Sequence, residues 1–272
     1  MNSTNASISV NPAQISPTDK APQDGTACSS PPCGREPGER GAEALQVGGL
    51  TPLTTTDYPG QLAAVVFCQG CPWRCGYCHN PHLIPRTGET GGWLDVVSFL
   101  RRRQGLLDAV VFSGGEPTLQ SGLPEACAAV REMGFKVGLH TAGPYPERLG
   151  AVLPLLDWVG MDIKAPFSVY DQITQVPGSA ARARESLHLL LGSGVEHEIR
   201  TTLHTGLLRH DQVLELAHEL AGAGVRNFVL QIFRTQGCAE PLLCRGDGGN
   251  FAWDTLRAEI QPMFQRFSIR GA

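Results

Sequence analysis

The 272-residue sequence lacks an excess of basic residues and also lacks any long apolar run. It contains 22 Lys and Arg against 26 Asp and Glu, for a net charge of −4, which argues against a protein that binds nucleic acid mainly through phosphates. No apolar run approaches the roughly 18 residues needed to cross a bilayer. We therefore expect a soluble protein whose partners are neither nucleic acids nor membranes.

The first 45 residues contain few aliphatic and aromatic side chains and are rich in Ser, Pro, Gly and Asn. This composition cannot offset the entropy cost of ordering the chain, so we expect a disordered tail over residues 1–45. One folded domain is then expected over residues 46–272. The tail has no basic stretch followed by an apolar one, which argues against a secretory signal.

The cysteine content adds an expectation about cellular location. Nine cysteines without a predicted secretory signal indicate a reducing cytoplasm, where clustered thiols hold metal more often than they form disulfides. Cys28 and Cys33 lie in the predicted tail and are interpreted as incidental thiols, with extra metal ligands as the alternative. Cys127 is interpreted as a small buried helix residue. Cys238 and Cys244 are predicted in a mobile loop, with a second metal site as the alternative.

Six short apolar runs alternate with helix-length segments from about residue 46 onward. The runs are rich in Val, Ile and Phe and mostly continuous, which is typical of strands buried on both faces. Such alternation predicts right-handed crossovers and a parallel sheet covered by helices. We predict an α/β fold, a partial (β/α)6 barrel of the TIM type, with a doubly wound sheet as the alternative. The predicted strands cover residues 62–67, 106–112, 135–140, 157–163, 196–203 and 227–233, and the predicted helices cover 93–105, 122–134, 146–156, 181–194, 211–224 and about 252–265.

Polar or glycine-rich segments follow every predicted strand. In a barrel or an open parallel sheet, functional side chains gather where strands end and the next loops begin. Six such ends meeting at one rim therefore predict a single site. The segments are CQGCPWRCGYCHNP (68–81), SGGEPT (113–118), HTAG (140–143), DIKAP (162–166), RTT (200–202) and QIFR (231–234).

The first of these segments places four cysteines within eleven residues. A site with four thiolates is coordinatively full, whereas a site with three leaves a position open for chemistry. The spacing Cys71-x3-Cys75-x2-Cys78 favours three ligands in one loop, with Cys68 left at the end of the first strand. A four-ligand zinc knuckle or a ferredoxin-like cluster that includes Cys68 is the alternative.

The other segments give weaker signals. Adjacent glycines followed by Glu116 permit close approach of a ligand to the main chain, although such a sequence is more often only a turn. Asp162 and Lys164 are two residues apart on a predicted strand and project the same way. A charged pair inside a barrel costs several kcal/mol to desolvate unless it is paired or liganded, so it is either a ligand site or a structural salt bridge. Arg200 likewise either binds carboxylate or ribose oxygens of a ligand or forms a salt bridge with a nearby acid.

Taken together, CPWRCGYCHNP, SGGEP, MDIKAP and EIRTT resemble the radical S-adenosylmethionine enzymes. The Cys-x3-Cys-x2-Cys motif is the most specific signature of that family, and Tyr77 occupies the aromatic position before its third cysteine. The stretch from Gly49 to Pro85 is similar to the activating enzymes of glycyl-radical proteins. It most resembles the activator of anaerobic ribonucleoside-triphosphate reductase, and the resemblance extends over residues 46–235.

The resemblance implies a 4Fe–4S cluster held by Cys71, Cys75 and Cys78, with the methionine end of S-adenosylmethionine on the fourth iron. It implies reductive cleavage of S-adenosylmethionine and removal of hydrogen from a glycine of a partner enzyme by the resulting 5′-deoxyadenosyl radical. Further cofactor contacts are implied at Tyr77, Gly114, Gly115, Glu116, Asp162, Lys164 and Arg200.

The resemblance also implies two protein partners: a glycyl-radical enzyme, expected to be anaerobic ribonucleoside-triphosphate reductase, and a flavodoxin- or ferredoxin-type reductant. Activation of a pyruvate formate-lyase-type enzyme, or radical modification of another substrate, is the alternative within this chemistry. A non-catalytic iron–sulfur or zinc-binding module is the alternative outside it. Two positions depart from the family pattern, because His140 stands where relatives carry an acid and Cys68 is an additional cysteine.

Overall fold

The computed structural model describes residues 45–88, 91–245 and 251–271. The predicted disordered tail, with Cys28 and Cys33, lies outside the described residues except for Leu45. That side chain is only 2% exposed and packs in the core, so the folded domain includes it. Within the described ranges, no helix is long and apolar enough to cross a membrane.

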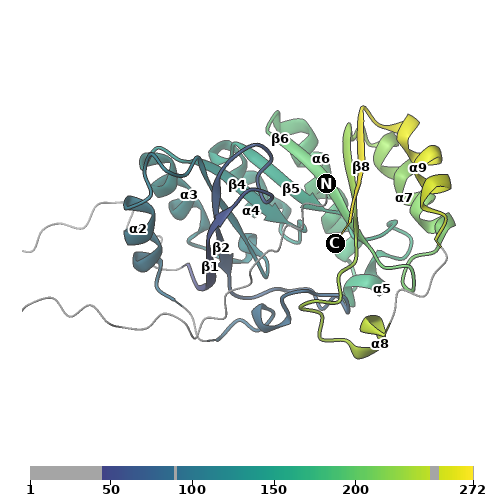
Figure 1. Cartoon of the computed structure of the whole chain (residues 1–272), viewed down its shortest axis with the longest axis horizontal. Coiled ribbons are helices and arrows are strands. Elements are labelled where there is room, and N and C mark those ends of the chain that lie inside the picture. Colours follow the sequence, from purple (N-terminus) through teal and green to yellow (C-terminus); the bar gives the residue numbers. More distant parts are fainter. Residues whose placement is uncertain (1–44, 89–90, 246–250, 272) are drawn as a thin grey trace, which may run out of the picture.

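An eight-stranded sheet forms the centre of the molecule, and its strands follow one another in the order of the sequence (Figure 1). β1 pairs antiparallel with β2, and all later neighbours pair in parallel. The first and last strands are each paired on one side only in this order, which makes the sheet an open barrel wall. The strands are β1 (Val47–Thr54), β2 (Ala63–Cys68), β3 (Ala109–Gly114), β4 (Lys136–Thr141), β5 (Trp158–Asp162), β6 (Glu196–Leu203), β7 (Asn227–Ile232) and β8 (Arg266–Arg270).

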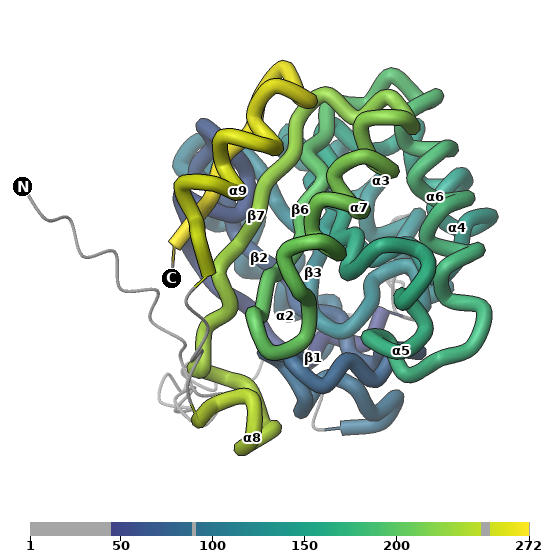
Figure 2. Tube along the Cα trace, turned by 90° about the vertical axis from the view of Figure 1, so that its right-hand side faces the viewer, coloured from purple at the N-terminus to yellow at the C-terminus, as the bar shows by residue number. Residues whose placement is uncertain are grey.

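Helices cover the outer face of this sheet, with α7 and α9 over its C-terminal strands (Figure 2). The parallel arrangement with helical crossovers confirms the predicted partial barrel. The helices are α2 (Trp93–Arg101), α3 (Leu123–Glu132), α4 (Pro146–Val152), α5 (Tyr170–Thr174), α6 (Ser179–Ser193), α7 (His210–Gly222), α8 (Pro241–Cys244) and α9 (Trp253–Ile260).

Two strands, β1 and β8, were not predicted from the sequence. The sheet therefore has eight strands instead of six. The predicted last helix over residues 252–265 is also wrong at its end, because α9 stops at Ile260 and is followed by a 3-10 turn from Gln261 to Met263. Pro262 cannot donate a helical hydrogen bond, which explains the early end.

The central strands are buried on both faces, as their continuous apolar runs predict. Along β2, Ala64 and Val66 face the helices, whereas Ala63 and Val65 face the barrel interior, as the two-residue period of a strand requires. A small cluster of aromatic and aliphatic side chains, which includes Tyr58 and Trp158, fills the barrel interior. Within this cluster the ring of Tyr58, which precedes β2, stacks on the ring of Trp158 with the centroids 5.2 Å apart.

Gly160 on β5 allows two large side chains to cross this interior. A Cβ atom at this position would lie 2.7 Å from both Arg200 Nη1 and Trp158 Cη2. Arg200 has little freedom to move away, because its guanidinium donates to Asp162 Oδ1 at 2.8 Å and to the Gly160 carbonyl at 3.3 Å. The absence of a side chain at residue 160 therefore fixes where Arg200 lies.

We expect Gly160→Ala to lower the free energy of unfolding by about 1–3 kcal/mol, the usual cost of overpacking a core. Gly150→Ala is the matched control, since a Cβ there meets nothing within 4 Å on a helix. That change should raise stability by about 0.5–1 kcal/mol. Urea denaturation of both variants measures the difference. Equal stability of the two would contradict the packing described for Gly160.

Candidate active site

One pocket lies where the parallel strands end, and it brings together all ten residues predicted as cluster ligands or cofactor contacts. Its cavity volume is about 190 Å³, and beyond that the pocket is open to solvent. Its lining from the sequence prediction is Cys71, Cys75, Tyr77, Cys78, Gly114, Gly115, Glu116, Asp162, Lys164 and Arg200. Sequence reasoning gave no site role to the further lining residues Trp73, His79, Asn80, Ser113, Thr141 and Ala142, and it flagged His140 only as a departure from the family pattern.

The base of the cysteine loop, residues 71–80, is closed by main-chain hydrogen bonds. Gly70 N–H donates to Leu83 O at 2.8 Å, and Cys71 N–H donates to Ile84 O at 3.0 Å. The buried Gln69 side chain adds a third closure, because its Nε2 donates to Pro85 O at 2.7 Å. Sequence reasoning missed Gln69, since no local pattern shows that its side chain reaches residues beyond the loop.

Cys68 is separate from the other three cysteines of the motif. It is fully buried, pairs with Gly114 in the sheet, and does not line the pocket. Cys71, Cys75 and Cys78 are partly exposed and do line it. Burial raises the pKa of Cys71 to about 12, and burial also raises the pKa of Cys75. A metal bound at these thiols must therefore displace protons from them.

Glu116 ties the end of β3 to the end of β4. Its carboxylate accepts from Thr118 N at 3.0 Å, Thr118 Oγ1 at 2.5 Å, Thr141 Oγ1 at 2.7 Å and Ala142 N at 3.0 Å. Burial raises the pKa of Glu116, and these four donors oppose that rise. Oε1 receives three of the donors, so Oε2 keeps more accepting capacity for a further partner.

Gly114 and Gly115 serve chain packing as well as the pocket. A Cβ on Gly114, whose φ is +111°, would lie 2.5 Å from Cys68 N, and a Cβ on Gly115 would collide with the Gly70 carbonyl. Glycine is therefore required for β3 to lie against the base of the cysteine loop. The Gly-Gly pair was predicted to admit a ligand, and contact between two parts of the chain is a second reason for it.

Asp162, Lys164 and Arg200 form a charged group on the opposite wall. Arg200 Nε donates to Asp162 Oδ1 at 2.8 Å, and Lys164 Nζ lies 3.9 Å from Asp162 Oδ2. Burial alone would raise the pKa of Asp162, but the two cations outweigh it and hold the pKa below its usual range. β5 ends at Asp162, so Lys164 lies beyond the strand on which it was predicted. Because the group has two cations and one anion, this wall of the pocket carries a net positive charge.

His140 is a neutral residue in this pocket. Its Nε2 lies 2.8 Å from the Asp57 carbonyl, which can only accept, so Nε2 carries the proton and Nδ1 accepts from Ser113 Oγ at 3.3 Å. Burial, followed by the nearby Arg200 charge, lowers the pKa of His140 to about 4. The imidazole therefore adds no charge to the pocket near neutral pH.

Residues 65–220, more than half of the chain, match the Radical SAM superfamily. The chain belongs to this superfamily. As a radical SAM enzyme it uses a 4Fe–4S cluster and S-adenosylmethionine.

Two relatives and one solved structure are similar to the chain. It is 30% identical over 181 residues to a Methanocaldococcus jannaschii protein provisionally described as a glycyl-radical enzyme activating enzyme, covering 63% of this chain and 73% of that protein. It is 35% identical to 7-carboxy-7-deazaguanine synthase of Methanopyrus kandleri, over 40% of this chain and 52% of that protein. The SuiB structure from Streptococcus suis, bound to the precursor peptide SuiA, superposes with a TM-score of 0.60 at 15% identity, covering 75% of this chain and 47% of SuiB. The chain thus spans only about half the length of the last two, and SuiB shows the fold alone.

The pocket fits the cofactors of a radical SAM enzyme. Three thiols share it with one carboxylate that has spare accepting capacity and with a net positive wall, a combination that suits a cluster beside an amino acid group. The Tyr77 hydroxyl lies buried at this pocket without a hydrogen-bond partner in the described part of the chain. A polar ligand bound in the pocket would supply the hydrogen-bond partner that this buried hydroxyl lacks.

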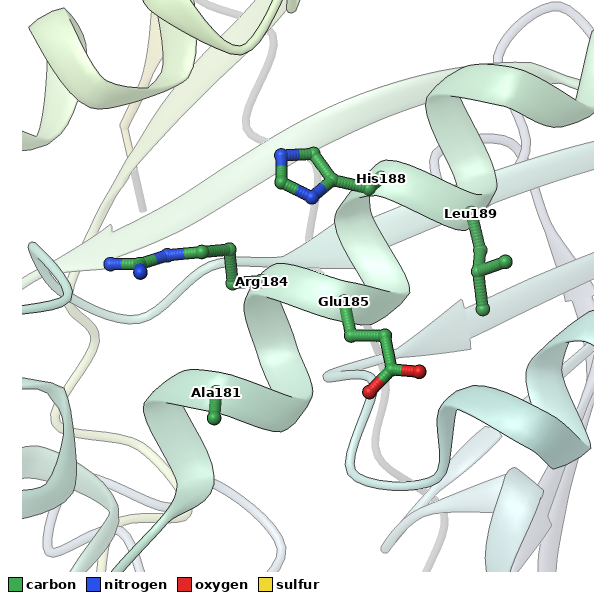
Figure 3. Close-up of a pocket in the computed structure, with 5 residues that line it drawn as sticks. All are labelled: Ala181, Arg184, Glu185, His188 and Leu189. Atoms are coloured by element: carbon green, nitrogen blue, oxygen red, sulfur yellow. The ribbon is translucent and has the colours of Figure 1, made fainter.

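A second concave surface lies on the outer face of α6, away from the strand ends (Figure 3). Ala181, Arg184, Glu185, His188 and Leu189 line it from one side of the helix. It contains no thiol, and its charged side chains project along an exposed surface. Of these two hollows, only the strand-end pocket has thiols that could hold a cluster.

Proposed function

We propose that this radical SAM enzyme generates a glycyl radical on a partner enzyme, with anaerobic ribonucleoside-triphosphate reductase as the first candidate. The observation that carries the proposal is the assembly of all ten motif residues at one pocket. The similarity to a protein described as a glycyl-radical enzyme activator supports the choice of reaction.

In this proposal Cys71, Cys75 and Cys78 hold the cluster. When bound, the cluster would supply the electron for reductive cleavage of S-adenosylmethionine. The chain keeps the loop in position through the closure at Gly70 and Cys71, and through Trp73, whose ring packs edge-on against Tyr170 at 5.8 Å. A fourth thiolate would occupy the open iron position, which is why the separation of Cys68 matters.

The remaining predicted contacts are proposed to orient S-adenosylmethionine. The main chain at Gly114 and Gly115, with Glu116 Oε2, would receive the methionine ammonium. The positive wall formed by Arg200 and Lys164 around Asp162 would hold the methionine carboxylate and the ribose hydroxyls. Tyr77 contributes a buried hydroxyl and a ring beside Lys164, whose Nζ lies 5.7 Å from the ring centroid.

The partner and the reductant would reach the site from its open end. The sheet order leaves β1 and β8 as separate edges among the described strands, so the barrel wall is not closed. A glycine-bearing loop of the partner enzyme could enter there. A flavodoxin- or ferredoxin-type protein would supply the electron.

A second candidate keeps the same chemistry and changes the substrate. The similarity to 7-carboxy-7-deazaguanine synthase of Methanopyrus kandleri and to PqqA peptide cyclase of Xanthomonas, two proteins named for other reactions, supports this alternative. Activation of a pyruvate formate-lyase-type enzyme, or modification of another peptide or small molecule, is therefore the competing proposal.

The test is anaerobic reconstitution of the chain with iron, sulfide, S-adenosylmethionine, reduced flavodoxin and each candidate partner. We expect an electron paramagnetic resonance doublet of a glycyl radical with the ribonucleotide reductase, and none when its radical glycine is replaced by alanine. A doublet only with a pyruvate formate-lyase-type partner would favour the second candidate. Cleavage of S-adenosylmethionine without a glycyl radical on any partner would refute glycyl-radical activation.

A further inference from the structure

A short segment after β7, residues 233–244, lies across the outside of the cysteine loop, and we call it the strap. His79 Nε2 donates to Arg234 O at 2.9 Å, and the His79 ring stacks on Phe233 with centroids 5.3 Å apart. Gly237, with φ +87°, packs so closely that a Cβ there would lie 2.5 Å from His79 O. The beginning of the strap is therefore fitted to the loop that carries Cys75 and Cys78.

The far end of the strap is also anchored. His204 at the end of β6 lies with Nε2 3.0 Å from Leu243 O, and Leu243 packs beside Gly76 of the cysteine loop. Figures 1 and 2 both show α8, which forms this end, at the same end of the sheet as the loop after β2. A change in the shape of the strap therefore reaches the cysteine loop directly.

The strap contains two cysteines that take no part in the pocket. Cys238 Sγ lies 3.7 Å from Gly76 O, a main-chain atom between two motif cysteines. Cys244 Sγ lies 3.6 Å from the main-chain oxygen of Cys238 and 3.8 Å from Thr235 O, so the two cysteines are neighbours within the strap. Both are partly exposed, whereas Cys127 is fully buried in α3. Exposed neighbouring thiols are the ones that small oxidants reach.

We propose that Cys238 and Cys244 are a reversible thiol–disulfide site that fastens the strap over the cysteine loop. The oxidant is a low-molecular-weight disulfide, RSSR. The S–H bonds of both cysteines and the S–S bond of RSSR break, one Cys238–Cys244 bond forms, and two RSH leave with the two electrons and two protons. In a reducing compartment the pair stays open, and a shift to oxidising conditions closes it.

The consequence of closure is a stiffer cysteine loop. In the open state the strap is held to residues 76–79 by two hydrogen bonds, one ring stack and the contacts at Gly237 and Gly76. A disulfide removes conformations in which Cys238 moves away from Gly76, because it ties Cys238 to the anchored end at Leu243 and Cys244. The site thus couples the redox poise of the cell to the cluster-bearing loop, independently of which partner enzyme is activated.

The test uses the full-length, iron-loaded chain in glutathione buffers of increasing oxidised fraction, followed by alkylation and peptide mapping. We expect a Cys238–Cys244 cross-link that is lost on adding reduced glutathione. Cys244→Ser should give only a glutathione adduct at Cys238, and Cys127→Ser should behave as the parent chain. Mapping separates this bond from any bond between Cys28 and Cys33.

The second readout is hydrogen–deuterium exchange of residues 76–80. Exchange should slow several-fold in the oxidised parent chain and remain unchanged in oxidised Cys244→Ser. The proposal is overturned if both thiols stay reduced at the oxidising end, if Cys238 pairs with a cysteine outside the strap, or if the cross-link forms and exchange of the loop does not change.

Discussion

Replacing Cys75 by alanine should abolish both bound iron and the formation of 5′-deoxyadenosine. Cys75 is the middle of three thiols that line the pocket from one short loop. With two thiolates left, a cluster would lose one of the three ligands that hold it while the fourth position stays open for the cofactor. Iron analysis after anaerobic reconstitution and product assay by chromatography measure the two losses. We expect activity to fall by at least about a hundredfold, the order seen when a group acting only in the reaction is removed.

Cys68→Ala is the matched control for this experiment. The residue is a cysteine of the same segment, yet it is buried at the end of β2 and outside the pocket. It should keep the full iron content and product yield, with a stability loss of about 1 kcal/mol for the missing sulfur in a packed core. Loss of the cluster in Cys68→Ala would favour four-thiolate ligation. Retained cleavage in Cys75→Ala would remove the basis for the proposed ligand set.

Replacing Glu116 by alanine should destabilise the protein, because Glu116 links the end of β3 to the end of β4. The change leaves the buried main-chain N–H of Thr118 and the partly buried N–H of Ala142 without their acceptor. Each orphaned donor costs about 1–3 kcal/mol, so we expect a loss of about 3–5 kcal/mol in the free energy of unfolding. Urea denaturation of the iron-free chain measures it without interference from the cofactors.

Glu116→Gln separates this bracing role from the proposed contact with S-adenosylmethionine. The amide keeps one oxygen for the three donors at Oε1 and loses the acceptor facing Ala142, so stability should fall by only about 1–2 kcal/mol. It also loses the negative charge offered to the ammonium. Equilibrium dialysis of S-adenosylmethionine with the iron-loaded variant should therefore show about tenfold weaker binding. Unchanged affinity would argue that Glu116 only braces the rim.

The six central strands could be predicted because their apolar runs are continuous and buried on both faces. β1 and β8 could not be predicted by the same signal. β1 reads VGGLTPLT, in which two glycines and a proline interrupt the pattern, and it is largely half-exposed. β8 is five residues long with arginine at both ends. Arg270 gains a partner only in three dimensions, where it forms two 2.8 Å hydrogen bonds to the buried Glu198 on β6.

The site residues also divide into those with a local signal in the sequence and those whose role depends on residues far away in the chain. The cysteine spacing and the polar strand ends mark the ten pocket residues, because each signal lies within a few positions of the sequence. The neutrality of His140 depends on the Asp57 carbonyl, 83 positions away. The contact of Cys238 with Gly76 spans 162 positions. Spacing in one sequence carries no information on such pairs.

The sequential order of the strands has a consequence for how the protein is made. Each strand pairs with the strand just before it, so the sheet can grow as the chain leaves the ribosome. The base of the cysteine loop acquires its closing contacts once residues 83–85 and 115–116 have folded, and its middle gains the contacts of Trp73 and Arg74 after residues 170–174 follow. The strap follows more than a hundred residues later and depends on β7. For that interval of synthesis the three thiols lie in a loop that the strap does not yet cover.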